Sequence, residues 1–142
     1  MVTVKNILDS KGRNVFSIRP DQSVLEAMKI MAEKEVGALI VLDGEKTAGI
    51  ITERDYARKI ILKGRSSSDT QVREIMTTKV IHAQPATTIE NCRALMFEKK
   101  IRHLPVLEDG ILCGMISIRD LMKAIIDDQQ YTIEQLERFI TS

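Results

Sequence analysis

Gly49-Ile50-Ile51-Thr52-Glu53-Arg54-Asp55 and Gly114-Met115-Ile116-Ser117-Ile118-Arg119-Asp120 are two copies of one short pattern. Each copy predicts a buried strand that ends at the hydroxyl residue and leads into a helix. The start of a helix exposes backbone N–H groups and the positive end of the helix dipole, so an anion can bind there. The aspartate three positions on is an acceptor-only group, which suits a partner with two neighbouring hydroxyls, such as a ribose. Phosphate and ribose together describe a nucleotide.

The same residues also fit a purely structural role. Thr52 with Asp55, and Ser117 with Asp120, have the spacing of a capping box, in which the first residue caps the helix and the acid caps back. A single copy favours capping, whereas two copies at equivalent places favour a ligand site. Arg54 and Arg119 precede the two aspartates. They are either exposed side chains of a first helical turn or contacts to a ligand phosphate.

The pattern belongs to a longer internal repeat. A shift of 65 positions aligns residues 15–60 with residues 80–125 without an insertion. Each copy predicts a short strand, a helix, two strands joined by an Asp-Gly hairpin, and a second helix. One such unit buries little apolar surface alone. We therefore predict an α/β fold of two β-α-β-β-α repeats, packed sheet to sheet about a pseudo-twofold axis with two equivalent clefts.

The repeat divides the chain into residues 1–64, residues 65–126 and a C-terminal segment, 127–142. Upstream of the repeats, Val4–Leu8 matches Val72–Met76, which places three extra residues in a loop around Ser10–Asn14. The C-terminal segment predicts an amphipathic helix because its apolar residues recur at helical spacing. This helix has no counterpart after the first copy, so it is expected to cover the module or to meet a second subunit.

Composition narrows the function classes. The 142 residues carry a net charge of +1, so no broad basic face is implied and nucleic acid is not expected as a partner. No apolar run is long enough to cross a membrane or to act as a secretory core, which favours a cytoplasmic protein. Cys92 and Cys113 form no CxxC pair and are expected to be inert thiols. With two histidines and no GxxxxGK[ST] loop or nucleophile beside a base, neither a metal cluster nor an enzyme is expected.

In combination, the motifs resemble a known family. The duplicated hydroxyl-x-x-Asp junction, the strand Ile101–Val106 and the Asp-Gly hairpin are similar to the cystathionine-β-synthase (CBS) domain, which occurs in pairs as the Bateman module. The resemblance spans roughly residues 4–126, and it extends to stand-alone two-CBS proteins of bacteria and plant organelles. It implies a regulatory module that binds an adenosine-containing ligand: AMP, ADP, ATP, S-adenosylmethionine or NAD(H). It also implies chains that pair into a flat homodimer.

The resemblance also assigns site residues by position. The carboxylates of Asp55 and Asp120 would hold ribose hydroxyls, with Thr52 and Ser117 near the ribose or phosphate. Arg102 and His103 match phosphate-facing positions. The first copy has Gly37 and Ala38 at those places, so the two sites are expected to be unequal. The positions that would border the adenine are Ser17, Ile18, Ile50, His82, Ala83 and Met115.

Two hypotheses from different classes follow. In the first, the chain senses an adenine nucleotide or NAD(H) between the repeats and signals to a regulated enzyme or transporter. In the second, the clefts stay empty, the junctions only cap helices, and the chain is a protein-interaction adaptor that uses its C-terminal helix. A basic cluster formed by Arg58, Lys59, Lys63 and Arg65 is expected to be a solvated helix end rather than a second phosphate site.

Overall fold

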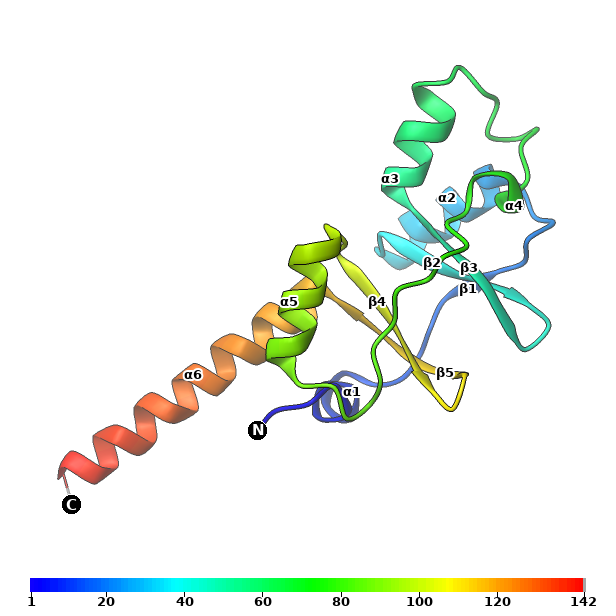
Figure 1. The fold of residues 1–142 in the computed structure, drawn as a ribbon. Coiled ribbons are helices and arrows are strands. Elements are labelled where there is room, and N and C mark those ends of the chain that lie inside the picture. Colours follow the sequence, from blue (N-terminus) through cyan, green and yellow to red (C-terminus); the bar gives the residue numbers. More distant parts are fainter. Residues whose placement is uncertain (142) are drawn as a thin grey trace. The chain divides into compact units, whose positions relative to one another are not determined.

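The computed structural model describes residues 1–141 and separates into two compact units (Figure 1). One unit is Asn14–Ile81, and the other combines Met1–Arg13 with the chain from His82 onward. These units differ from the predicted division at residue 64, which follows the order of the repeats along the chain. The short helix that precedes each repeat belongs to the compact unit formed by the other repeat. Each unit is therefore described by itself below.

The unit Asn14–Ile81 contains a three-stranded sheet in the order β1-β2-β3. Strand β1 runs parallel to β2, and β2 runs antiparallel to β3. Its elements are β1 (Ser17–Ile18), α2 (Val24–Lys34), β2 (Ala38–Asp43), β3 (Lys46–Thr52), α3 (Glu53–Tyr56), the π-helical η1 (Ala57–Ile61) and α4 (Val72–Ile75).

The spacing of apolar residues along the chain explains how the helices of this unit pack against its sheet. Helix α2 is capped by Ser23, whose hydroxyl accepts from the Glu26 amide at 3.1 Å, as the capping box predicts. One face of the helix then buries Val24, Ala27 and Met31. Strand β2 is buried along its first four residues, as expected for a continuous apolar run covered on both faces. The sheet, α2 and the end of η1 share one apolar core, to which α4 contributes Val72 and Ile75.

The other unit repeats this plan with a reduced sheet. Strands β4 and β5 form an antiparallel pair, and the place of β1 is taken by a single parallel bridge between Ala83 and Val106. Its elements are α1 (Val4–Lys11), α5 (Ile89–Lys99), β4 (His103–Glu108), β5 (Ile111–Ser117) and α6 (Ile118–Thr141). The strand order predicted for both copies is therefore complete only in the first.

Two helices extend into segments that the sequence analysis assigned differently. Helix α1 continues to Lys11, so part of the expected loop Ser10–Asn14 is helical. Helix α6 runs without a break from Ile118 to Thr141, so the predicted amphipathic segment after residue 126 continues the second helix of the repeat. Figure 1 shows this helix extending well past α1 and α5 of its own unit. Among residues 1–141, no helix has the length and apolar character needed to span a bilayer.

Candidate functional site at the two strand-to-helix junctions

Both junctions form capping boxes. At the first, the Asp55 amide donates to Thr52 Oγ1 at 3.1 Å and the Thr52 amide donates to Asp55 Oδ2 at 3.0 Å. At the second, the Asp120 amide donates to Ser117 Oγ at 3.2 Å and the Ser117 amide donates to Asp120 Oδ2 at 2.9 Å. The structural role that the sequence left open is thus present at both sites. A ligand that contacts these carboxylates must either leave the capping bonds in place or displace them.

The first helical amide of each junction is also engaged. The Glu53 amide donates to the Gly37 carbonyl at 3.1 Å, and the Ile118 amide donates to the Arg102 carbonyl at 2.8 Å. Two of the backbone donors that a helix start offers are therefore used within each unit. An anion at either junction would depend on the remaining donors and on nearby cations.

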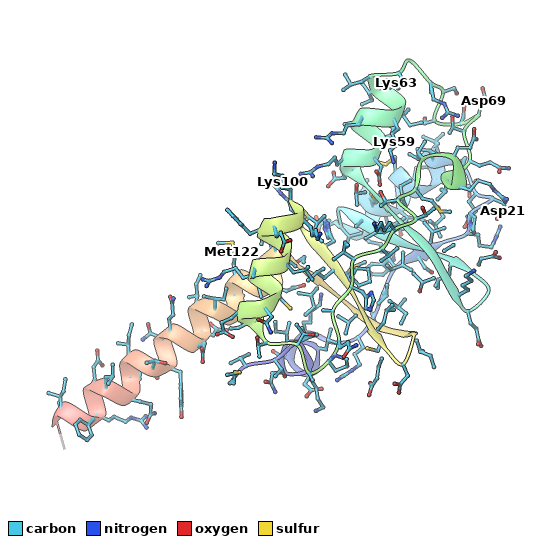
Figure 2. The ribbon with its side chains drawn as sticks, in the orientation of Figure 1. Asp21, Lys59, Lys63, Asp69, Lys100 and Met122 are labelled. Atoms are coloured by element: carbon cyan, nitrogen blue, oxygen red, sulfur yellow. The ribbon has the colours of Figure 1, made fainter. Side chains whose placement is uncertain are left out.

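Asp55 is a buried structural residue. Its exposed fraction is 7%, and its second oxygen, Oδ1, accepts from Thr77 Oγ1 at 3.2 Å and lies 3.2 Å from Lys59 Nζ. The same ammonium donates to the Ile75 carbonyl at 2.8 Å. Figure 2 shows Lys59 on the helical segment that follows the junction. Both oxygens of Asp55 are thus engaged, and Oδ1 connects α3 to Thr77 in the segment that follows α4 (Val72–Ile75).

Asp120 is more open and has a different partner. Lys11 Nζ lies 2.7 Å from Asp120 Oδ2 and donates to the Met115 carbonyl at 2.8 Å. The capping bond from Ser117 uses the same carboxylate oxygen, so Oδ1 takes part in neither contact. Burial raises the pKa of Asp120, but the hydrogen bonds from Lys11 and Ser117 outweigh this and hold the pKa below its ordinary value.

This pKa shift predicts a pH-dependent contribution to stability. A lowered folded-state pKa stabilises the fold above the unfolded-state pKa of about 3.9, and the contribution disappears as the pH falls through the folded-state value. We expect Asp120→Asn to lower the free energy of unfolding at pH 7, and the gap to wild type to narrow below about pH 4. Urea denaturation of both proteins between pH 7 and pH 3 measures this. A gap that stays constant over that range would show that the ionised carboxylate adds nothing.

A pocket of about 640 Å³ lies beside Asp120 within the same unit. Helix α1 contributes Asn6, Ser10 and Lys11 to its lining, and α6 contributes Asp120 and Tyr131 among others. Its volume is in the range of small-molecule sites. Of the site residues predicted from the sequence, Asp120 is the one that lines it.

The other predicted site residues are distributed over both units. In Asn14–Ile81, Ser17 is exposed, Ile18 and Ile50 are buried, and Arg54 is exposed on the first turn of α3. Ser17 pairs with Ile40, which pairs in turn with Ile50, so the predicted adenine-bordering residues lie on neighbouring strands. The Ile50 amide and carbonyl are both bonded to Thr77, at 3.0 and 2.8 Å.

The second unit holds the remaining predicted residues. His82, Arg102 and Arg119 are exposed, and Ala83 is buried. The register of β4 and β5 places His103 opposite Ser117 and Pro105 opposite Met115. The Pro105 carbonyl accepts from the Ala83 amide at 2.9 Å, so Ala83 and Met115 flank Pro105 on opposite sides of β4.

Sequence reasoning missed Lys11 and Thr77. Each contacts the junction of its compact unit from a segment that precedes the other repeat. A repeat alignment alone does not reveal such an exchange. Lys59 was noted, but as part of a solvated basic cluster, whereas its ammonium is bonded to Asp55 and to the Ile75 carbonyl.

Cys92 does not have the properties of a reactive thiol, and residues 1–141 form no candidate metal site. Cys92 and Cys113 are free thiols, and burial raises the pKa of Cys92 to about 11. A thiol with that pKa is almost entirely protonated at pH 7 and is a poor nucleophile. Over residues 1–141, no cluster of three or more His, Cys, Asp or Glu side chains could hold a metal ion.

A family comparison identifies the fold and its repeats. A profile described as CBS domain matches residues 1–62 and 72–127. The chain belongs to the CBS-domain family. The match covers both repeats, of which the first forms the complete β-α-β-β-α unit and the second has an isolated bridge at Ala83 in place of its first strand.

Individual relatives share the pair of CBS domains. The chain is 38% identical to the mitochondrial CBS domain-containing protein CBSX3 of Arabidopsis thaliana, over 97% of this chain and 71% of that protein. A protein with CBS domains from Burkholderia ambifaria has a similar structure, with a TM-score of 0.87 and 51% identity over 90% of this chain and 96% of that one. A hexameric CBS-CP12 protein from cyanobacteria is 30% identical, with a TM-score of 0.76, over 86% of this chain and 70% of that one. The chain is therefore a CBS pair, which is a regulatory module.

Proposed function

We propose that this CBS pair binds an adenosine-containing ligand, AMP, ADP, ATP or NAD(H), and passes the signal to an enzyme or transporter. The observation that carries the proposal is the junction at Asp120. A partly exposed carboxylate with one oxygen outside the capping bond lies beside the ammonium of Lys11 at the start of α6. A carboxylate can accept from a ribose diol, and an ammonium can donate to a phosphate.

The two junctions are proposed to differ in function. Asp55 is buried and engages Thr52, Lys59 and Thr77, so a ligand that used it would have to displace bonds already made. At Asp120 the existing bonds of the carboxylate use only Oδ2, so a ligand would compete only for that oxygen and for the ammonium of Lys11. The sequence predicted unequal sites because only the second copy has Arg102 and His103. The different partners of Asp55 and Asp120 are a second reason to expect this inequality. The Asp120 junction is the proposed primary ribose contact.

The binding proposal is tested by calorimetric titration with AMP, ATP and NAD+ in separate experiments. We expect at least one of them to bind, and Asp120→Asn to weaken that binding by about one to two powers of ten, because a hydrogen bond to a charged group contributes roughly 1.5–3 kcal/mol. The asparagine oxygen can still cap the helix, so the fold is retained.

A matched control removes the same charge elsewhere in the same unit. Asp109 is at the tip of the β4–β5 hairpin, with a φ of 53° that asparagine tolerates, so Asp109→Asn should leave the affinity unchanged. Equal affinity in wild type and Asp120→Asn would remove the ribose assignment. No heat signal with any of the three nucleotides would remove the adenosine proposal itself.

The alternative is an adaptor whose clefts stay empty. It is favoured by the exposed apolar residues of α6, which apart from Tyr131 lie outside the pocket beside Asp120. Thermal melts separate the two functions, because a ligand that binds only the folded state raises the midpoint.

For the location, we propose the cytoplasm. The Arabidopsis relative is named as mitochondrial, so fractionation of the native host would test this.

A further inference from the structure

Helix α6 carries an apolar stripe on its surface, interrupted at Gln129. Its exposed residues Met122, Ile126, Ile133, Leu136 and Ile140 are separated by four, seven, three and four positions. Gln129 divides the seven-residue interval into three and four. The resulting alternation of four and three is the a/d pattern of a coiled coil, with isoleucine at three successive a positions. In Figure 2 the labelled Met122 marks the start of this stripe on α6.

The unit that contains α6 does not cover this stripe. Leu121 is the one residue of α6 described as buried, and every residue from Gln129 to Thr141 is exposed. The exposed fractions along the stripe lie between 48% at Ile133 and 79% at Ile140. A helical segment of this length gains little stability in water by itself, and most helices are held by packing an apolar face. The stripe therefore fits a partner surface.

We propose that the partner is α6 of a second copy of this chain, packed antiparallel. About a twofold axis at Tyr131, the stripe is complementary to itself. Ile126 meets the partner's Leu136, and Met122 meets the partner's Ile140. In the two central layers Gln129 meets the partner's Ile133. Each layer thus pairs an a position with a d position, and the stripe of each chain covers that of the other.

Charge favours the antiparallel direction. Lys123 and Glu137 both occupy e positions that flank the stripe, and an antiparallel pair places Lys123 beside the partner's Glu137 on both sides of the axis. Lys123 forms an exposed ion pair with Asp127 at 3.0 Å, which leaves its ammonium accessible to a second carboxylate. A parallel pair would instead set Lys123 beside the partner's Ile118 and Glu137 beside the partner's Thr132. That arrangement makes no ion pair across the interface.

Cysteine cross-linking of the full chain tests both pairing and direction. In a Cys92→Ala, Cys113→Ala background, we expect Ile126→Cys combined with Leu136→Cys to form a disulfide-linked dimer under mild oxidation. The first repeat has Ala27 and Ala48 at the positions of the two native cysteines, so the background substitutions suit the fold. Each single variant should stay monomeric on a non-reducing gel, because in the antiparallel pair Ile126 does not face the partner's Ile126.

A control pair has the same sequence geometry on the outer side of the helix. Asp127→Cys with Gln135→Cys is centred on the same axis but lies outside the stripe, so it should not cross-link. Thiol titration first establishes that every introduced cysteine reacts. Efficient cross-linking of the single variants would indicate parallel helices and overturn the proposal, and so would reactive thiols that never cross-link in the Ile126, Leu136 double variant.

The mass in solution gives an independent measurement. Leu136→Lys places a charge in the proposed interface at a site that is 58% exposed in the single chain, so the fold should be retained. Light scattering should show the dimer dissociating at least about tenfold more readily, a shift of about 1.4 kcal/mol. Unchanged circular dichroism confirms that the unit is folded. An oligomer that is insensitive to Leu136→Lys would pair through another surface, which contradicts the proposal whether or not nucleotides bind.

Discussion

Replacing Asp55 with alanine is expected to lower the free energy of unfolding by about 2–4 kcal/mol, the largest loss predicted for a single side chain at either junction. The substitution removes the capping bond from the Thr52 amide, and it leaves Thr77 Oγ1 and the Lys59 ammonium without the oxygen that they contact. Lys59 is 44% exposed, so its ion pair is screened and contributes a small part of the loss. Urea denaturation followed by circular dichroism measures the change.

Two companion variants isolate the causes. Thr52→Ala removes the hydroxyl acceptor of the cap but keeps the Asp55 contacts to Thr77 and Lys59, so a loss of about 1 kcal/mol is expected. Asp120→Ala removes a cap and a half-exposed ion pair, so it should also cost less than Asp55→Ala. If Asp55→Ala proved no more harmful than Thr52→Ala, the contacts of Asp55 with Thr77 and Lys59 would make no net contribution to stability. Asp55 would then be available to a ligand after all.

The sequence predicted the local structure well because that structure depends on neighbouring residues. The strand β2 follows from a run of apolar residues, and the start of α2 follows from Ser23 and Glu26, three positions apart. The family was also predicted correctly, since the repeat and its junctions lie within short stretches of chain. The capping box itself was an open alternative, because the same spacing serves both capping and ligand binding.

The contacts that distinguish the two junctions could not be predicted in this way. Lys11 and Asp120 are 109 positions apart, and Thr77 and Asp55 are 22 positions apart. Both contacts depend on the exchange of α1 and α4 between the repeats. No local propensity encodes which unit a short helix joins, because a helix of four to eight residues can pack on either copy of a repeated sheet.

This exchange explains how one motif yields two unequal sites. After α4 the chain continues extended, so Thr77 pairs with Ile50 and its hydroxyl reaches Asp55. Helix α1 continues for another turn, and the ammonium of Lys11 instead reaches the Met115 carbonyl and Asp120. A backbone segment therefore closes the first junction, whereas a flexible side chain covers the second. A side chain can move aside for a ligand at a lower cost than a paired backbone.

Gly49→Ala is expected to lower the free energy of unfolding by about 1–3 kcal/mol through overpacking. A Cβ atom at Gly49 would lie 2.6 Å from the carbonyl oxygen of Thr77. That carbonyl is held by the Ile50 amide at 3.0 Å, so it cannot retreat without breaking the pairing between β3 and the segment after α4. Chemical denaturation measures the loss, and increased hydrogen exchange at the Thr77 amide would locate it.

Gly114→Ala provides the matched comparison in the other unit, where the obstacle is a side chain. Its Cβ would lie 2.7 and 2.8 Å from the two methyl groups of Leu8. Shortening Leu8 to valine should therefore recover part of the stability lost in Gly114→Ala, so the two substitutions should not be additive. At Gly49 the nearest side chain is Met76, at 3.1 Å, but the closer atom belongs to the backbone. Met76→Ala should consequently fail to rescue Gly49→Ala, and a successful rescue would show that the Thr77 segment yields more easily than its paired hydrogen bonds imply.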